Sequence, residues 1–319
     1  MPTLVSARPR SLHNVQIACL CGQQRASLRG RSGRFSILRC HACRLERLSP
    51  QPTVQELDNL YSERYFESDD PGSPGYAAYG AMHDALTAAA EAQMSTMPSL
   101  DDIGGAGELL DVGCGYGTFI ALARAAGWNA RGIDYSAAAA AAAHSRYGVD
   151  VEVGDFARHG AGYGRFDVLT MWDAIEHFPD PLRALQSAYR ALKPGGRLIL
   201  STPDTASWDA RLLGRRWYGY TKVPEHLWYF DRQTLGALGE RAGFRVLEAR
   251  PWGFVRTLGF CTDKLGVYHP VLGSVARKVT DIARVTDKRL FFTILDMLLV
   301  LERPLQDPSS MPGAASLAA

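Results

Sequence analysis

Residues 108–117, ELLDVGCGYG, decide the fold class of this 319-residue chain. The apolar run Glu108–Val112 predicts a short buried strand, and the three glycines after it predict a tight turn into a helix that extends to Ala126. Glycines in such a turn allow close backbone approach, and N–H groups at a helix start can bind an anionic group. The turn is therefore a candidate ligand site.

Strand and helix patterns alternate downstream of this turn. Ser136 precedes an alanine-rich helix, and further helices are expected at Asp180–Leu192 and Asp231–Gly243. Such alternation predicts a doubly wound α/β sheet with ligands at the carboxyl ends of its strands. The further strands expected on local pattern are Asn129–Asp134, Asp150–Gly154, Phe166–Trp172, Arg197–Ser201 and Phe244–Arg250.

Acidic residues stand at three successive strand ends. Asp111 lies two residues before the first glycine, Asp134 ends the second strand, and Asp155 follows the third. An ionised carboxylate only accepts hydrogen bonds, so Asp134 suits a ribose diol. Asp155 can accept from an adenine amino group while Phe156 lies beside the ring. Together with the glycine turn, the three acids predict a site for a nucleoside-containing cofactor.

Four of the six cysteines gather near the front of the chain, at Cys19, Cys21, Cys40 and Cys43. The second pair and the distance between the pairs match a zinc ribbon, and residues 35–39 alternate like a short strand. The first pair departs from the pattern, because one residue separates its thiols where two are usual. His13 or His41 is an alternative ligand, and a degenerate ribbon that folds without metal is the competing interpretation.

Charge is distributed unevenly along the chain. Residues 1–50 hold nine arginines, no lysine and one acid, a net charge of +8, so the remainder carries −6 of the total of +2. This front end is either a solvated basic surface or a contact for an acidic partner such as nucleic acid.

Composition excludes several classes of protein. Hydrophobic residues make up 46% and charged residues 21%, which argues against a disordered or fibrous chain. Six cysteines are too few for a disulfide scaffold, no signal-peptide pattern follows Met1, and no apolar stretch predicts a transmembrane segment. We therefore expect a cytoplasmic protein with reduced thiols.

These patterns suggest four parts. Residues 1–50 form a zinc-ribbon-like module, and 51–100 form a linker with helical patterns at Val54–Tyr61 and Ala77–Met97. Residues 101–306 form the main domain with a helical insertion at about 251–290, and 307–319 form a disordered tail. The insertion is expected to be a lid or a homodimer contact, with a membrane-surface contact as the alternative.

Several motifs of the chain resemble those of a known enzyme family. Residues 108–117, with Asp134, Asp155 and residues 194–196 (PGG), resemble the class I S-adenosylmethionine-dependent methyltransferases. Residues 172–181 (WDAIEHFPDP), 224–230 (PEHLWYF) and 242–244 (AGF) resemble their bacterial small-molecule subfamily. Its members often carry paired cysteines in front, followed by a Leu-Tyr-Ser…Tyr-Phe segment, here residues 60–62 and 65–66. The resemblance extends from Cys19 to about Pro304 and implies a seven-stranded Rossmann-like sheet whose last, antiparallel strand is Asp296–Arg303.

The resemblance also implies roles for the site residues. The first turn would hold the amino-acid end of S-adenosylmethionine, Asp134 the ribose, and Asp155 with Phe156 the adenine. A nicotinamide dinucleotide is the alternative ligand. Its binding sites have the motif G-x-G-x-x-G, whereas the third glycine here comes one residue early. The complete expected cofactor set is Asp111, Gly113, Gly115, Gly117, Asp134, Tyr135, Asp155, Phe156 and Asp173.

Methyl transfer to a hydroxyl group also needs a base, because the acceptor must lose a proton. His177 and His226 are the candidates, with Glu176, Glu225 and Asp173 as partners; the alternative is that each histidine is a structural hydrogen-bonding residue. The expected acceptor is a saccharide, sugar nucleotide, glycolipid or other secondary metabolite. Competing hypotheses are an RNA methyltransferase that holds nucleic acid on its basic ribbon, and a catalytically inactive binding module. The fourth strand lacks the Asn/Asp-Pro-Pro-Tyr motif of base amino-group methylation.

Overall fold

The structure is a computed structural model that describes residues 19–61, 83–160, 162, 164–286 and 288–305. His13, the pair at residues 65–66 and the expected tail at 307–319 lie outside these ranges. Among the described residues, no helix is both long and apolar enough to cross a lipid bilayer.

A seven-stranded sheet forms the centre of the molecule, in the order β10-β11-β8-β7-β4-β5-β6. The pairs β4–β5, β4–β7, β5–β6 and β7–β8 are parallel, whereas β11 runs antiparallel to both β8 and β10. This topology confirms the predicted doubly wound Rossmann-like sheet with an antiparallel last strand. The strands are β4 (Glu108–Val112), β5 (Asn129–Asp134), β6 (Val151–Val153), β7 (Phe166–Trp172), β8 (Leu192–Pro203), β10 (Arg245–Thr257) and β11 (Arg289–Glu302).

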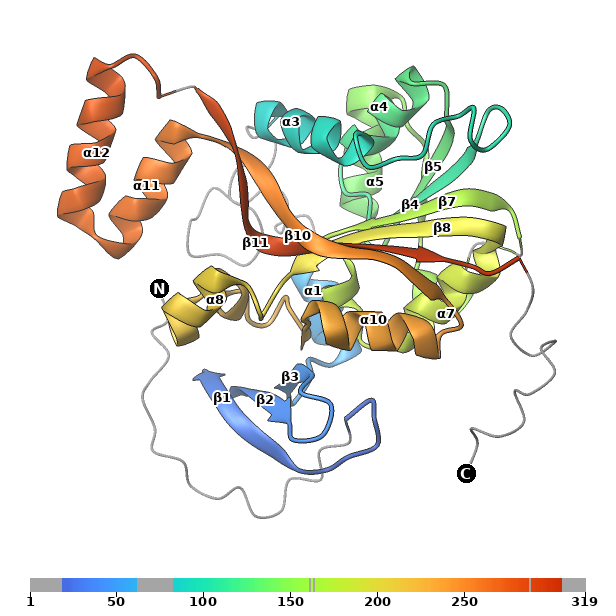
Figure 1. Cartoon of the computed structure of the whole chain (residues 1–319), viewed down its shortest axis with the longest axis horizontal. Helices are drawn as coiled ribbons and strands as arrows, with labels where there is room; N and C mark the ends of the chain where they lie inside the picture. Colours follow the sequence, from blue (N-terminus) through green and yellow to red (C-terminus); the bar gives the residue numbers. More distant parts are fainter. Residues whose placement is uncertain (1–18, 62–82, 161, 163, 287, 306–319) are drawn as a thin grey trace.

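Helices cover both faces of this sheet (Figure 1). On one side lie α3 (His83–Met94), α4 (Thr118–Ala125) and α5 (Ala137–Tyr147), and on the other α7 (Pro181–Ala191) and α10 (Arg232–Arg241). Side-chain caps start several of them: Ser136 accepts from the Ala139 N–H, and Asp180 accepts from the Arg183 N–H. Alternate residues of the central strands pack into two cores, for example Leu110 on one face and Leu109 on the other.

The front of the chain forms a second sheet. It contains β1 (Ala26–Ser32), β2 (Phe35–Cys40) and β3 (Glu46–Ser49), and β9 (Trp228–Tyr229) of the main domain pairs with β3. Glu46 is buried at this junction, where it pairs with Arg29 and accepts a 2.6 Å hydrogen bond from the Tyr220 hydroxyl. The ribbon is thus bonded to the main domain through backbone and side chains.

Short helices lead into and out of these sheets. Helix α1 (Val54–Leu60) follows the ribbon and begins at a capping box formed by Thr53 and Glu56. After β6 and β8 the chain forms α6 (Phe156–His159), α8 (Trp208–Leu213) and α9 (Tyr218–Thr221), which local pattern did not predict.

Several boundaries differ from the sequence-based expectation. The described part of the helix expected at 77–97 ends at Met94, and β8 is longer than residues 197–201 because it includes Pro194-Gly195-Gly196. The expected helical insertion at 251–290 is shorter, because β10 continues to Thr257 and pairs there with β11, which begins at Arg289. Only α11 (Leu258–Tyr268) and α12 (Pro270–Ile282) are helical in it. The two strands satisfy each other's backbone groups beyond the main sheet, a long-range pairing that local pattern does not reveal.

Candidate active site

Asp134 is anchored by two backbone N–H groups, one from the glycine turn and one from the segment after β5. It ends β5 as a buried side chain, and its two carboxylate oxygens accept 2.8 Å hydrogen bonds from the N–H groups of Gly115 and Ser136. Burial raises the pKa of Asp134, while these N–H groups act in the opposite direction. Because each carboxylate oxygen has a second lone pair, the anchored group can still accept from a ligand hydroxyl.

The glycine turn fits its position for a steric reason. Gly113, Gly115 and Gly117 all have positive φ, a conformation that L side chains rarely adopt. A Cβ on Gly113 would lie 2.9 Å from the Cβ of Ala174, which follows β7. The turn that would hold a cofactor therefore packs directly against the segment that carries Glu176 and His177.

Asp111 lies inside the sheet. It is buried on β4 and accepts a 2.7 Å hydrogen bond from the Thr170 hydroxyl on β7. Burial raises the pKa of Asp111 to about 7. Its expected contact with a cofactor stays a prediction.

The structure places Asp155 and Phe156 at the start of α6. Asp155 caps this helix by accepting from the N–H groups of Ala157 and Arg158, and it forms an ion pair with the Arg158 side chain. The Phe156 ring belongs to the main hydrophobic core and is 2% exposed. The expected adenine contacts of both residues stay predictions.

Tyr135 and Asp173 flank the candidate site. Tyr135 is 42% exposed, and its hydroxyl donates to Asp58. Asp173 directly follows β7 and has a φ of 49°, and its carboxylate accepts a 2.9 Å hydrogen bond from the Ser201 hydroxyl. A positive φ in a non-glycine residue at a strand end is a feature that recurs at functional sites.

The two histidines selected from the sequence lie together around Glu176, and we call these three residues the Glu-His-His cluster. Glu176 and His177 belong to the 3-10 turn Ile175–His177, whereas His226 lies just before β9. Both Nε2 atoms lie 4.0 Å from Glu176 Oε1, and the two rings meet edge to face with centroids 5.0 Å apart. Glu176 is 1% exposed and His226 6%.

The orientation of the His177 ring follows from its hydrogen bonds. Its Nδ1 atom lies 2.9 Å from the Glu225 carbonyl oxygen and 3.0 Å from the Tyr61 hydroxyl. A carbonyl oxygen only accepts hydrogen bonds, so the proton of the neutral ring belongs on Nδ1. The unprotonated Nε2 atom then faces Glu176.

Burial sets the charge state of the cluster. It lowers the pKa of His177 and, together with the nearby His177 and Lys222, lowers the pKa of His226 well below its usual value. Burial, and then the charge of Asp173, raises the pKa of Glu176 well above its usual value. Both imidazoles are therefore neutral at neutral pH and can accept a proton or a metal ion.

Sequence reasoning missed the contribution of Tyr61. This residue ends α1, and its ring lies 6.1 Å from that of Tyr135 and 6.2 Å from that of His177, edge-on to both. It thereby joins the end of β5 to the Glu-His-His cluster. The sequence placed Tyr61 in a resembling segment, but its contact with a histidine 116 positions away has no local signal. Glu176 was expected only as a partner of the histidines, yet it lies between them.

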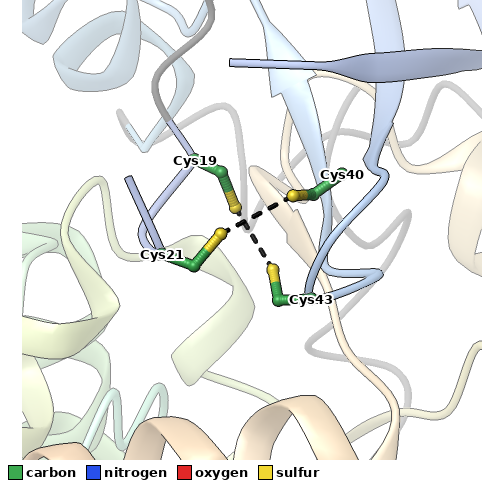
Figure 2. Close-up of side chains that lie close together, drawn as sticks. All are labelled: Cys19, Cys21, Cys40 and Cys43. Carbon is green, nitrogen blue, oxygen red and sulfur yellow. Dashed lines mark hydrogen bonds between the residues drawn. The ribbon is translucent and has the colours of Figure 1, made fainter. Parts of the chain in front are cut away.

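The four cysteines of the ribbon also converge (Figure 2). The Sγ atoms of Cys19 and Cys43 are 3.4 Å apart, those of Cys21 and Cys40 are 3.6 Å apart, and all four lie within 4.8 Å of one another. Four sulfurs about 2.3 Å from one tetrahedral zinc are spaced at about 3.8 Å, so this donor set fits the metal. Although burial opposes it, the backbone N–H groups of Cys43 and Ala42 lower the pKa of the Cys40 thiol to about 7.

Comparisons with known proteins identify the family of the chain. The family profile of the methyltransferase domain matches residues 78–249, more than half of the chain. A ubiquinone biosynthesis O-methyltransferase of Pseudomonas aeruginosa (strain UCBPP-PA14) is 36% identical over 158 residues, which is 44% of this chain and 66% of that protein. An uncharacterized 37.1 kDa protein in transposon TN4556 of Streptomyces fradiae is 35% identical over 156 residues, 47% of this chain and 43% of that one. The chain thus spans less than two thirds of the length of each of these two curated relatives.

A solved structure supports the fold alone. One chain of the complex between the Haloferax volcanii Trm112 methyltransferase activator and a methyltransferase superposes with a TM-score of 0.51 at 18% identity. The match covers 70% of this chain and 93% of that chain.

Proposed function

We propose that this chain, which belongs to the methyltransferase domain family, is an S-adenosylmethionine-dependent methyltransferase whose acceptor is the hydroxyl group of a small molecule. The observation that carries this proposal is the pair of neutral imidazoles beside the glycine turn, one from the buried His226 and one from the partly buried His177. An alcohol must lose its proton during transfer, and a neutral imidazole is suited to accept it. The name of the Pseudomonas relative, an O-methyltransferase, adds loose support.

We assign cofactor binding to the end of the sheet between β4 and β5. The glycine turn would hold the amino-acid end of S-adenosylmethionine, and Asp134 would accept from the ribose. Asp111, Tyr135, Asp155, Phe156 and Asp173 complete the proposed set. The bound cofactor supplies a methyl group on a sulfonium sulfur, which keeps the electron pair of the broken carbon–sulfur bond.

His177 and His226 would then act on the acceptor. One of them takes the hydroxyl proton on Nε2 while the acceptor oxygen forms its bond to the methyl carbon. Tyr61 and the Glu225 carbonyl hold the His177 ring in place. A fixed ring favours one direction in which the acceptor oxygen can approach the methyl carbon. The chain as a whole aligns acceptor and methyl group and removes one proton.

The cysteine ribbon is proposed to hold one structural zinc ion within residues 1–50. The convergence of the four thiols supports this, and the Cys-x-Cys spacing does not prevent it. Metal analysis of untagged protein produced without added zinc should find about one zinc per chain. A metal-free protein of unchanged fold would favour the degenerate ribbon.

Nucleic acid is the alternative acceptor, because residues 1–50 carry a net charge of +8. The motifs at residues 172–181 and 224–230, which resemble the small-molecule subfamily, favour the small molecule over RNA.

The decisive experiment is incubation with S-adenosylmethionine labelled on its methyl group. Fractionated native metabolites and total RNA are offered separately at two salt concentrations. We expect label in a metabolite fraction and none in RNA. Label in RNA, with binding that falls steeply with salt, would contradict the proposal.

A further inference from the structure

The Glu-His-His cluster brings one carboxyl oxygen of Glu176 and the Nε2 atoms of two imidazoles to face one another. Both carboxylate oxygens of Glu176 are buried, and neither has a hydrogen-bond partner among the described residues. The two imidazole Nε2 atoms lie 4.0 Å from Glu176 Oε1, beyond hydrogen-bond range. A buried carboxylate without a partner is strongly unfavourable, so the cluster is incomplete as it stands.

Direct hydrogen bonding within the cluster does not resolve this. His177 carries its proton on Nδ1, where the Glu225 carbonyl accepts it, so its Nε2 offers a lone pair to Glu176. Imidazoles that bind metals are oriented in this way, with one ring nitrogen donating to a carbonyl and the other facing the ion.

We propose that Glu176, His177 and His226 together bind one divalent first-row metal ion through Oε1 and the two Nε2 atoms. The ligand atoms of the three residues all lie within 4.8 Å of one another. Bonds of about 2.1 Å place neighbouring ligands about 3.0–3.4 Å apart, so each imidazole would close on the carboxylate by less than about 1 Å. Two imidazoles and one carboxylate are a ligand set that leaves coordination positions open.

The location of the ion indicates a role in catalysis, and this role rests on the proposed function. The cluster adjoins the glycine turn through Ala174, so an acceptor oxygen at an open position would lie beside the cofactor end of the site. A bound cation lowers the pKa of a coordinated hydroxyl, as it does for water. The hydroxyl proton then leaves to solvent, the oxygen bonds to the methyl carbon, and sulfur keeps the electron pair of the broken bond. The ion keeps its oxidation state. When it is bound, both Nε2 atoms serve as ligands, and the ion takes over the activation of the hydroxyl that the proposed function assigns to the free imidazoles.

Open positions next to each other also select an acceptor. A molecule with two neighbouring oxygens, such as a vicinal diol or a hydroxy acid, can occupy both. We therefore infer that acceptors of this class are methylated faster than matched acceptors with a single hydroxyl.

The test is titration of Mn²⁺ into the full chain after dialysis against EDTA and then buffer, followed by electron paramagnetic resonance. The soft thiolates of the ribbon compete poorly for this ion. We expect one bound Mn²⁺ per chain. The substitutions Glu176→Gln and His226→Gln should each weaken binding at least about 100-fold, more than the loss of an outer partner does. The control is His144→Gln, which changes an exposed histidine of α5 that pairs with Asp150. This substitution should leave the affinity for Mn²⁺ unchanged.

Each outcome separates the two proposals. Affinity for S-adenosylmethionine that stays within a few-fold in Glu176→Gln shows that this variant folds. The absence of Mn²⁺ binding at millimolar concentration in wild-type protein that binds the cofactor, or equal binding in Glu176→Gln, overturns the metal site. Full methylation of a small-molecule hydroxyl in EDTA overturns the site and leaves the proposed function intact. Mn²⁺ binding with the expected variant pattern, but with label only in RNA, supports the site and overturns the proposed function.

Discussion

Asp134 and Glu176 are both buried carboxylates that follow strands on either side of β4, yet their surroundings differ. Asp134 receives a backbone N–H on each oxygen, one from the turn after β4 and one from the residue that caps the next helix after β5. Glu176 receives none among the described residues and faces two imidazoles from separate segments. In the proposed site, the cofactor end is therefore complete in the polypeptide alone, whereas the acceptor end would be completed by what binds there.

The largest effect is expected at the incomplete end. His226→Ala or His177→Ala should lower turnover by about 10²–10⁴-fold, because either loss removes a proton acceptor or a metal ligand. Affinity for S-adenosylmethionine should stay within a few-fold, since Asp134 and the glycine turn are untouched. Steady-state kinetics across pH and calorimetry measure the two quantities. Near-wild-type turnover in both variants would show that the cluster takes no part in the reaction.

At the proposed cofactor end, a substitution should reduce the affinity for S-adenosylmethionine more than it reduces the rate of methyl transfer. Asp134→Ala removes an anchored carboxylate whose hydrogen bonds to a ligand are charge-assisted, so affinity for S-adenosylmethionine should fall about 10–100-fold. It also leaves the Gly115 and Ser136 N–H groups without their acceptor. Calorimetry with Asp150→Ala, an exposed acid of the same type, as control measures the effect. Unchanged affinity would remove Asp134 from the cofactor site.

Asp111 provides an intermediate case, with one hydrogen bond from a side chain. Its pKa of about 7 lies above its ordinary 3.8, so the folded state holds the proton more tightly than the unfolded chain. The free energy of unfolding should therefore decrease as pH rises from about 4 to about 7, by at most about 4 kcal/mol from this group.

Asp111→Asn should remove this contribution while it retains an acceptor for Thr170. Chemical denaturation at several pH values measures it as the difference between variant and wild type. A difference that is constant from pH 4 to pH 8 would show that Asp111 does not titrate in this range.

The same contrast explains what could be predicted from the sequence. Asp134 bonds to residues 115 and 136, so a strand–turn–helix pattern of some thirty residues contains the whole arrangement, and β4, β5 and β7 lie where the pattern placed them. The Glu-His-His cluster joins residues from two distant segments, the turn Ile175–His177 and the stretch before β9. Its histidines were selected through a family resemblance, not through periodicity, and the contact of Tyr61 had no signal at all.

The lengths and partners of the strands at the edges of the two sheets could not be predicted from the sequence for a related reason. The pairing of β10 with β11 as far as Thr257 and Arg289, and that of β3 with β9, depend on partners far away in the sequence. Local composition describes how a segment can fold, but not which segment will lie beside it.

The junction of ribbon and main domain bears on how such chains can recombine. The Leu48 N–H donates to the Leu227 carbonyl, and the Leu227 N–H donates to the carbonyl of Glu176. One peptide segment thus connects a ribbon strand to the acceptor end of the site. A front segment exchanged between relatives would need to bring the stretch around His226 and β9 with it, so the two pieces are expected to be inherited together although about 180 positions separate them.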